Sequence, residues 1–256
     1  MQVSVEQIGL LCLAAFAAGF VDAIVGGGGL IQTPAALVLL RTYPVVTIIS
    51  CTKIPSFSGT LFAAIQYLKK VKLNQKLTVV MCTIAFFSSF AGSELLSVVS
   101  NDFMKPVLLL VLIVVAIYTY TKKDFGQHEA KDHPFTKELW FSIGISSIIG
   151  FYDGFIGPGA GSFLILAFIS FLGYDFLHSS AQAKLVNLAT NLGSIVLFTI
   201  KGKIIWLIAL PMAVCNAFGG ILGARMAIIK GNRFIRIFFL IIVVGTLLRF
   251  AWDVLF

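Results

Sequence analysis

Two aspartates and two lysines recur at one spacing in a sequence that is otherwise strongly apolar. Asp22 and Asp153 are 131 positions apart, and so are Lys53 and Lys184. A carboxylate within a membrane-spanning segment costs about 2.5–3.5 kcal/mol on insertion scales, so it usually faces a cavity or a partner. The two aspartates therefore suggest a proton relay, an ion-coupling site or a partner for a cation. An equally supported alternative is that each aspartate side chain caps the unwound backbone at its own glycine-rich segment.

The two lysines are the natural partners of these aspartates. Lys53 and Lys184 each stand at the entry to an apolar run. An ammonium there could bind an anionic substrate or neutralise an aspartate. The alternative is a lysine that extends along the helix to reach the membrane interface. If each aspartate pairs with a lysine, the core is neutral, and the charge of a bound anion must be met mainly by backbone amides.

Glycine-rich segments follow both aspartates. The first is Gly26-Gly27-Gly28-Gly29 and the second is Gly157-Pro158-Gly159-Ala160-Gly161-Ser162. Glycine in a helix costs about 1 kcal/mol relative to alanine, so each helix should break there and restart afterwards. Each restart would direct unpaired N–H groups and the positive end of a helix dipole at one point, which suits an anion. Two ordinary glycine-rich loops are the alternative.

These patterns predict a site made from both halves of the chain. The predicted substrate-binding residues are Gly26, Gly27, Gly28, Gly29, Lys53, Gly157, Gly159, Gly161, Ser162, Lys184, Asn187 and Asn191. Asp22 and Asp153 are assigned to ion coupling or charge pairing. Other candidate polar linings are Gln32, Thr33, Ser56, Ser58, Thr60, Gln182, Thr190 and Asn216. No metal or cofactor is expected, because the cysteines and histidines lack ligand spacing.

The composition places this site in a lipid environment. Of 256 residues, 59% are hydrophobic and only 12% are charged, and the mean hydropathy is +0.99. Soluble domains have about 25% charged residues. A soluble enzyme, a disordered chain and a secreted disulfide scaffold are thereby excluded. The net charge of +8 comes from clusters beside apolar runs, which indicates cytoplasmic loops and a lipid bilayer instead of nucleic acid.

Long apolar stretches predict the helices that carry these residues. Two shorter apolar pieces, 30–40 and 162–172, follow the glycine breaks and predict half-helices, because about 20 residues are needed to span a bilayer. The expected fold is an all-α polytopic membrane protein with eight to ten transmembrane segments. The long stretches are 8–25, 54–68, 77–99, 106–121, 139–156, 185–200, 204–228 and 235–255.

The 131-residue spacing predicts a duplicated chain. Gly19, Lys72 and Gly92 also have counterparts at this spacing, in Gly150, Lys203 and Gly223. We expect a first repeat at 1–121, a polar linker at 122–137 and a second repeat at 138–256, each with four or five spans.

The distribution of cations favours inverted repeats with both termini outside. With five spans in each repeat, the segments 69–76, 122–137 and 225–236 share one side and carry twelve Lys and Arg residues. Four spans would give a parallel arrangement. Glu94 and Arg225 follow the duplicated Gly92 and Gly223 and could pair across the halves, or stay solvated at helix ends.

The two glycine segments resemble the paired signatures of a known family. Gly19-Phe20-Val21-Asp22 with its glycine run, and Gly150-Phe151-Tyr152-Asp153 with its own, are similar to those of the sulfite exporter TauE/SafE family, also called the toluene sulfonate uptake permeases. The likeness extends through Thr52-Lys53, Ala183-Lys184-Leu185-Val186-Asn187 and Gly223-Ala224-Arg225. A departure is Pro55-Ser56-Phe57-Ser58, where relatives often carry an amide and small residues.

The resemblance implies transport of a small sulfur-containing anion, such as sulfite, a sulfonate or sulfoacetate, across the cytoplasmic membrane. It implies that a proton or sodium gradient drives transport, and a homo-oligomer is compatible with it. The paired glycine breaks themselves predict alternating access, in which one half rocks against the other. The rivals are a passive anion channel and an intramembrane aspartyl hydrolase in which Asp22 and Asp153 form a dyad. Carboxylate oxygens close to each other would favour the dyad, and aspartates that each face a lysine would favour transport.

Overall fold

The computed structural model describes residues 3–100, 103–104, 107 and 134–255, and of 231–255 it describes the backbone. Within that part the chain is all-helical. The helices are α1 (Val5–Val25), α2 (Gly29–Leu39), α3 (Val45–Leu68), α4 (Gln75–Val98), α6 (Phe135–Phe155), α7 (Ala160–Leu172), α8 (Phe176–Ile200) and α9 (Trp206–Leu255).

The architecture confirms the expected all-α membrane fold. Among the described residues, five helices are long and apolar enough to cross a membrane: α1, α3, α4, α8 and the part of α9 at Trp206–Lys230. α2 and α7 are short apolar helices that start directly after the glycine segments, as predicted. The predicted stretch 106–121, apart from residue 107, and most of the linker 122–137 lie outside the described residues.

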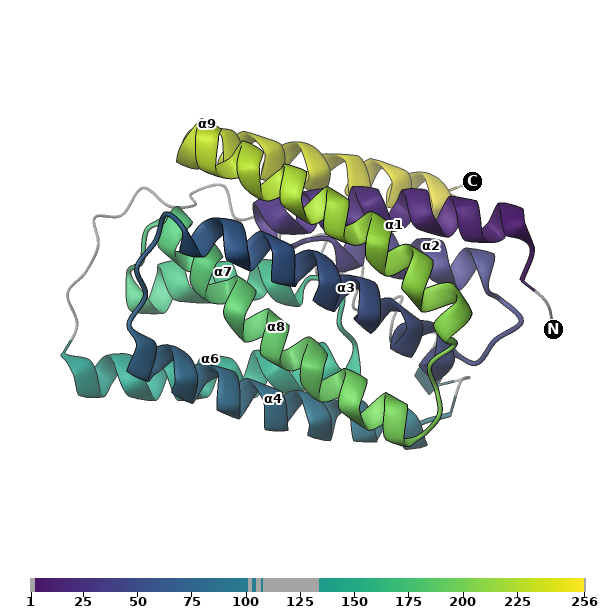
Figure 1. Cartoon of the computed structure of the whole chain (residues 1–256), viewed down its shortest axis with the longest axis horizontal. Coiled ribbons are helices and arrows are strands. Elements are labelled where there is room, and N and C mark those ends of the chain that lie inside the picture. Colours follow the sequence, from purple (N-terminus) through teal and green to yellow (C-terminus); the bar gives the residue numbers. More distant parts are fainter. Residues whose placement is uncertain (1–2, 101–102, 105–106, 108–133, 256) are drawn as a thin grey trace.

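The helices of the two halves begin at matching positions. α7, α8 and α9 start 131 residues after α2, α3 and α4 respectively. This register agrees with the spacing of the charged pairs, while the duplication and its inverted orientation stay predictions. α3 and α8 lie next to each other in the middle of the molecule, with α1, α2 and α9 on one side and α4 and α6 on the other (Figure 1).

The halves exchange packing partners. α1 of the first half packs on α9 of the second, and α6 of the second half packs on α4 of the first. α3 and α8 follow the same rule, since α3 packs on α9 and α8 on α4. Residues of one half therefore complete the core of the other half.

One expectation about helix boundaries is wrong. Lys53 and Lys184 do not stand at helix entries: α3 and α8 begin eight residues earlier, at Val45 and Phe176, and both lysines are buried. The predicted spans at 204–228 and 235–255 both lie within α9, and its part at Trp206–Lys230 is a candidate membrane span by itself. Its yellow C-terminal part runs back toward the start of α1 (Figure 1).

Close helix crossings depend on glycine at corresponding positions. A Cβ atom on Gly92 of α4 would lie 2.2 Å from the carbonyl oxygen of Phe151, and one on Gly223 of α9 would lie 2.3 Å from that of Phe20. Small residues let helix backbones approach each other in membranes. Gly92 and Gly223 thus set the distance at which the helices of one half pack on those of the other.

We expect Gly92→Ala to lower the thermal unfolding midpoint of the purified protein by several degrees, because α4 and α6 must separate to admit the methyl group. The destabilisation should be about 1–3 kcal/mol, as for other overpacked cores. Gly144→Ala in α6 is the matched control, since a Cβ there meets nothing within 4 Å. Equal midpoints for the two variants would contradict this role of Gly92.

Candidate functional site

Each long helix that carries an aspartate is followed, within two residues of its end, by a glycine in the left-handed conformation. Gly26 has φ +79° and its N–H donates to the carbonyl oxygen of Asp22 over 2.8 Å. Gly157 has φ +95°, and Gly159, just before α7, has φ +85°. Residues with a Cβ are strained at such angles, which explains why the chain turns at these glycines. The turns allow α2 and α7 to restart within the fold.

The two breaks touch each other. The Ser162 N–H donates to the Gly26 carbonyl over 3.0 Å, and the Ser162 hydroxyl donates to the Val25 carbonyl over 3.0 Å. A Cβ on Gly26 would lie 2.3 Å from the carbonyl carbon of Gly161. The end of α1 and the start of α7 are therefore locked together by backbone contacts that leave no room for a side chain.

The lysines and aspartates pair across the halves. Lys53 Nζ lies 2.9 Å from Asp153 Oδ1 and also donates to the Asp153 carbonyl over 2.5 Å. Lys184 Nζ lies 2.7 Å from Asp22 Oδ2 and donates to the Asp22 carbonyl. Each ammonium thus binds both the carboxylate and the last turn of the broken helix, where a cation also complements the helix dipole. These contacts exclude lysines that extend to the interface.

The two pairs differ in how tightly the carboxylate is held. Asp153 also accepts from Asn187 Nδ2 at 3.1 Å and from the Thr190 hydroxyl, and its side chain is 5% exposed. Asp22 accepts from the Gly28 N–H and the Thr60 hydroxyl, both at 3.4 Å, and its side chain is 19% exposed. Capping of its own glycine break therefore contributes at Asp22, as the alternative interpretation suggested.

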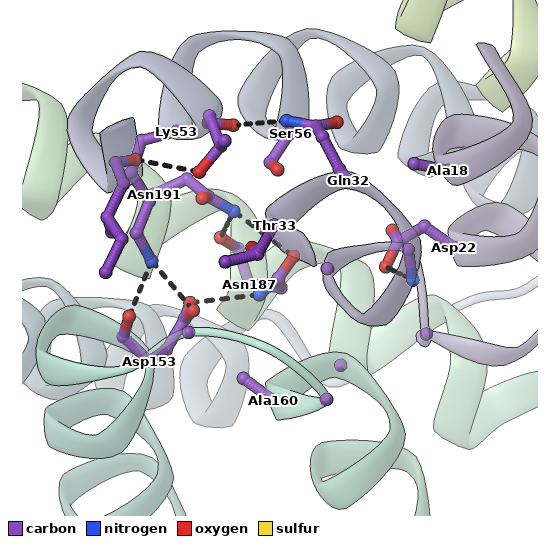
Figure 2. Close-up of a pocket in the computed structure, with 18 of the residues that line it drawn as sticks. Ala18, Asp22, Gln32, Thr33, Lys53, Ser56, Asp153, Ala160, Asn187 and Asn191 are labelled. Carbon is purple, nitrogen blue, oxygen red and sulfur yellow. Dashed lines mark hydrogen bonds and ion pairs between the residues drawn. The ribbon is translucent and has the colours of Figure 1, made fainter. Parts of the chain in front are cut away.

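A small cavity lies between the breaks. Its volume is about 40 Å³, enough for a few water molecules or one small anion. Figure 2 shows Lys53 directed at Asp153 on one side, with Asp22 on the opposite side. Its polar and glycine lining is Asp22, Gly26, Gly28, Gly29, Gln32, Thr33, Thr52, Lys53, Ser56, Asp153, Gly157, Gly159, Gly161, Asn187, Asn191 and Asn216.

Most of the predicted site residues meet at this cavity, and some do not. Gly27, Ser162 and Lys184 are absent from its lining: Ser162 holds the two breaks together and Lys184 binds Asp22 from behind. Ser58, Thr60, Gln182 and Thr190 are likewise outside it. Sequence reasoning missed the lining residues Ala18, Ile49, Thr52, Ile156 and Ala160, although Thr52 adjoins Lys53 in the duplicated segment.

The amide network fixes the cavity wall. Gln32 donates from Nε2 to the Thr52 carbonyl over 2.9 Å and accepts from Asn216 Nδ2 over 2.8 Å. The N–H groups of Gly29 and Gly161 at the starts of α2 and α7 have no acceptor within the described ranges. Both residues line the cavity. Two helix N-termini thus meet there, the arrangement that binds anions in many proteins.

Glu94 does not pair with Arg225. It forms an ion pair with Lys201 at 2.6 Å, at the end of α4 and α8. Both side chains are partly exposed, so this pair lies at the periphery.

We expect Thr190→Val to reduce the rate of uptake several-fold, because Asp153 loses a buried hydrogen bond worth about 1–3 kcal/mol. Thr83→Val is the matched control, since the exposed Thr83 hydroxyl donates only to a carbonyl of its own helix. Both variants should be assayed in liposomes at equal protein content. Uptake by Thr190→Val equal to that of the control would contradict the role of Thr190.

Comparison with known proteins decides the family. The family model described as sulfite exporter TauE/SafE matches residues 11–250. The chain belongs to the TauE/SafE family. The match spans both glycine breaks and both lysines, so the elements that form the cavity all lie within the shared region. The protein is a membrane transporter and not an enzyme, as the names of its relatives also indicate.

Curated relatives in this family cover nearly the whole chain. The probable membrane transporter protein ORF9 of Sinorhizobium sp. is 30% identical over 96% of this chain and 93% of its own length. The probable membrane transporter protein of Haemophilus influenzae is 31% identical over 92% and 91%. The probable membrane transporter protein YfcA of Escherichia coli K12 is 33% identical over 91% and 86%. No solved structure matches the chain significantly.

Proposed function

We propose that this TauE/SafE protein is a secondary transporter of a small sulfur-containing anion, of the sulfite or sulfonate class, in the cytoplasmic membrane. The observation that carries the proposal is the cavity between the two helix breaks, which is lined by helix N-termini and amides. The description of the family model as a sulfite exporter supports the sulfur class.

Charge balance at the cavity favours a monovalent or divalent anion bound by dipoles. The two lysines and two aspartates neutralise each other in pairs. The remaining positive potential comes from the starts of α2 and α7, each equivalent to about half an elementary charge. Asn187, Asn191 and Asn216 add side-chain amides that can donate to oxyanion oxygens. An oxyanion of sulfur presents several acceptor oxygens in a small volume, which matches this set of donors.

The rivals are less well supported by the geometry. An aspartyl dyad requires two carboxyl groups that share a proton, but Asp22 and Asp153 each form a pair with a different lysine. A passive channel requires an open path, whereas the cavity is small and its walls are joined by backbone hydrogen bonds. Transport by alternating access then requires the breaks to move.

We infer that Asp22 takes part in ion coupling and that Asp153 mainly holds Lys53 in place at the cavity, where uptake requires it. Asp22 is the more exposed carboxylate and its additional hydrogen bonds are longer. A proton or a sodium ion that reaches Asp22 would compete with Lys184 and loosen the contact between α1 and α8. Because the halves exchange helices, the moving unit must contain helices of both halves, in contrast to a simple rocking of one half against the other.

Liposomes with the purified protein test this function. Uptake of radiolabelled sulfite, thiosulfate and a short sulfonate should be measured with and without an imposed proton or sodium gradient. We expect saturable uptake that depends on one gradient. Asp22→Asn should lose the gradient dependence, and Asp175→Asn, at an exposed hydrogen bond with His178, is the control. Flux that neither saturates nor depends on a gradient would favour the channel.

A further inference from the structure

A second pocket, separate from the central cavity, is lined by cations. It has a volume of about 170 Å³ and shares no lining residue with the central cavity. Gln66, Lys69 and Lys70 line it from the end of α3 and the residues that follow. Arg225, Ile228 and Ile229 line it from α9. Half of these side chains are cationic and none is acidic.

The corresponding position between α4 and α8, 131 residues away in the sequence, contains an ion pair. Lys201, at the end of α8, donates to Glu94 over 2.6 Å and to Ser97 over 2.7 Å, both on α4. The positions 131 residues away from these three are Lys70, Arg225 and Ile228. All three line the cationic pocket.

The α4–α8 contact and the α3–α9 contact therefore have the same geometry but different charges. α4 packs on α8 as α9 packs on α3, so the contact between the helices is of the same kind. In the first place a carboxylate and a hydroxyl receive the ammonium of Lys201. In the second, a guanidinium and an isoleucine replace them, and Lys70 and Arg225 line a pocket in which no described residue contributes a carboxylate. Like charges in one pocket repel, and a bound anion would relieve this repulsion.

The residues around the cationic pocket indicate the kind of anion that it binds. Ile229 is 81% exposed and Leu68, beside Lys69, is 45% exposed. These apolar side chains belong to α3 and α9, which are both candidate membrane spans. Basic pockets between transmembrane helices bind the head groups of anionic lipids, and arginine binds phosphate oxygens in a bidentate fashion.

We propose that the pocket formed by Lys69, Lys70 and Arg225 binds the phosphate group of an anionic phospholipid. The guanidinium of Arg225 and the two ammonium groups contact the phosphate oxygens. The acyl chains lie along the exposed apolar surface that Leu68 and Ile229 provide. The bound lipid thereby joins the end of α3, which carries Lys53, to α9, which packs on α1.

Native mass spectrometry of the full chain in mild detergent tests this site. The probes are phosphatidylglycerol and the zwitterionic phosphatidylcholine. We expect clear preference for phosphatidylglycerol. The double variant Lys70→Gln/Arg225→Gln should bind it roughly 30-fold more weakly, given the attraction of each basic side chain for anionic lipid. The matched double variant Arg41→Gln/Lys76→Gln removes the same charges from exposed positions outside the pocket and should bind it normally.

Three results would overturn the proposal. Equal retention of the two lipids by the wild-type chain would show that the pocket does not select an anionic head group. Equal loss in the two double variants would show that only net charge matters. Displacement of phosphatidylglycerol by millimolar inorganic phosphate or sulfate, with retention of that ion, would assign the pocket to a soluble anion. None of these results depends on sulfite uptake, which is measured separately.

Discussion

Lys53→Met is expected to abolish anion uptake and to lower the thermal unfolding midpoint by about 10 °C. The substitution leaves the Asp153 carboxylate buried without its cation. Removing one partner of a buried ion pair costs about 3–5 kcal/mol, which corresponds to a shift of this size in a chain of this length. Circular dichroism of the detergent-purified protein gives the midpoint, and liposome assays give the uptake.

The double variant Lys53→Met/Asp153→Asn separates stability from function. It removes both charges, so the midpoint should return most of the way to that of the wild type, while uptake stays at background. Lys201→Met is the matched control, because it breaks a partly exposed pair with Glu94 and should cost less than about 1 kcal/mol. A stable single variant, or a double variant that transports, would refute the assignment of this pair.

Gly26→Ala is expected to bring uptake close to background, whereas Gly27→Ala should transport at nearly the wild-type rate. At Gly26, φ is +79° and a Cβ would overlap the backbone of Gly161 at 2.3 Å. The unfavourable conformation alone costs about 1–3 kcal/mol, and the overlap forces the two helix breaks apart. At Gly27, the nearest atom to a Cβ is the Ser162 hydroxyl at 3.6 Å, which is an ordinary contact.

The comparison of these neighbours is a strict test of the site. The variants differ by one position in the same run of glycines, so expression, insertion and hydrophobicity are matched. Uptake should be normalised to the amount of folded protein by size-exclusion chromatography. Normal transport by Gly26→Ala would show that the contact between the breaks is dispensable, and loss in Gly27→Ala would show that the whole run needs glycine.

The fold could be predicted from the sequence as far as local patterns determine it. The restarts at Gly29 and Ala160 follow from the conformational cost of glycine runs in helices, and the all-helical class follows from the hydropathy. The start of α3 at Val45 was missed because the polar residues Ser50, Thr52 and Lys53 interrupt the apolar pattern there. These side chains are buried, and each has a hydrogen-bond partner. Ser50 donates to the Lys203 carbonyl between α8 and α9, Thr52 to the Ile49 carbonyl within α3, and Lys53 to Asp153 of α6.

The sequence predicted which residues form the site, but not which lysine pairs with which aspartate. The 131-residue spacing selected the two aspartates and two lysines, but a spacing carries no information on which helices meet. The crosswise pairs arise because α3 and α8 both lie between the two breaks. The four glycines at 26–29 are equivalent in the sequence, and only the contacts of each backbone separate Gly26 from Gly27.

The crosswise ion pairs have a consequence for the synthesis of the protein. Lys53 finds Asp153 100 residues later, and Asp22 finds Lys184 162 residues later. At translation rates of 5–20 residues per second, these partners arrive roughly 5–30 s after the first charges are made. During that interval the nascent chain holds a carboxylate and an ammonium without their final partners. Truncated chains that end after α4 keep these unpaired charges, so we expect membrane quality control to degrade them.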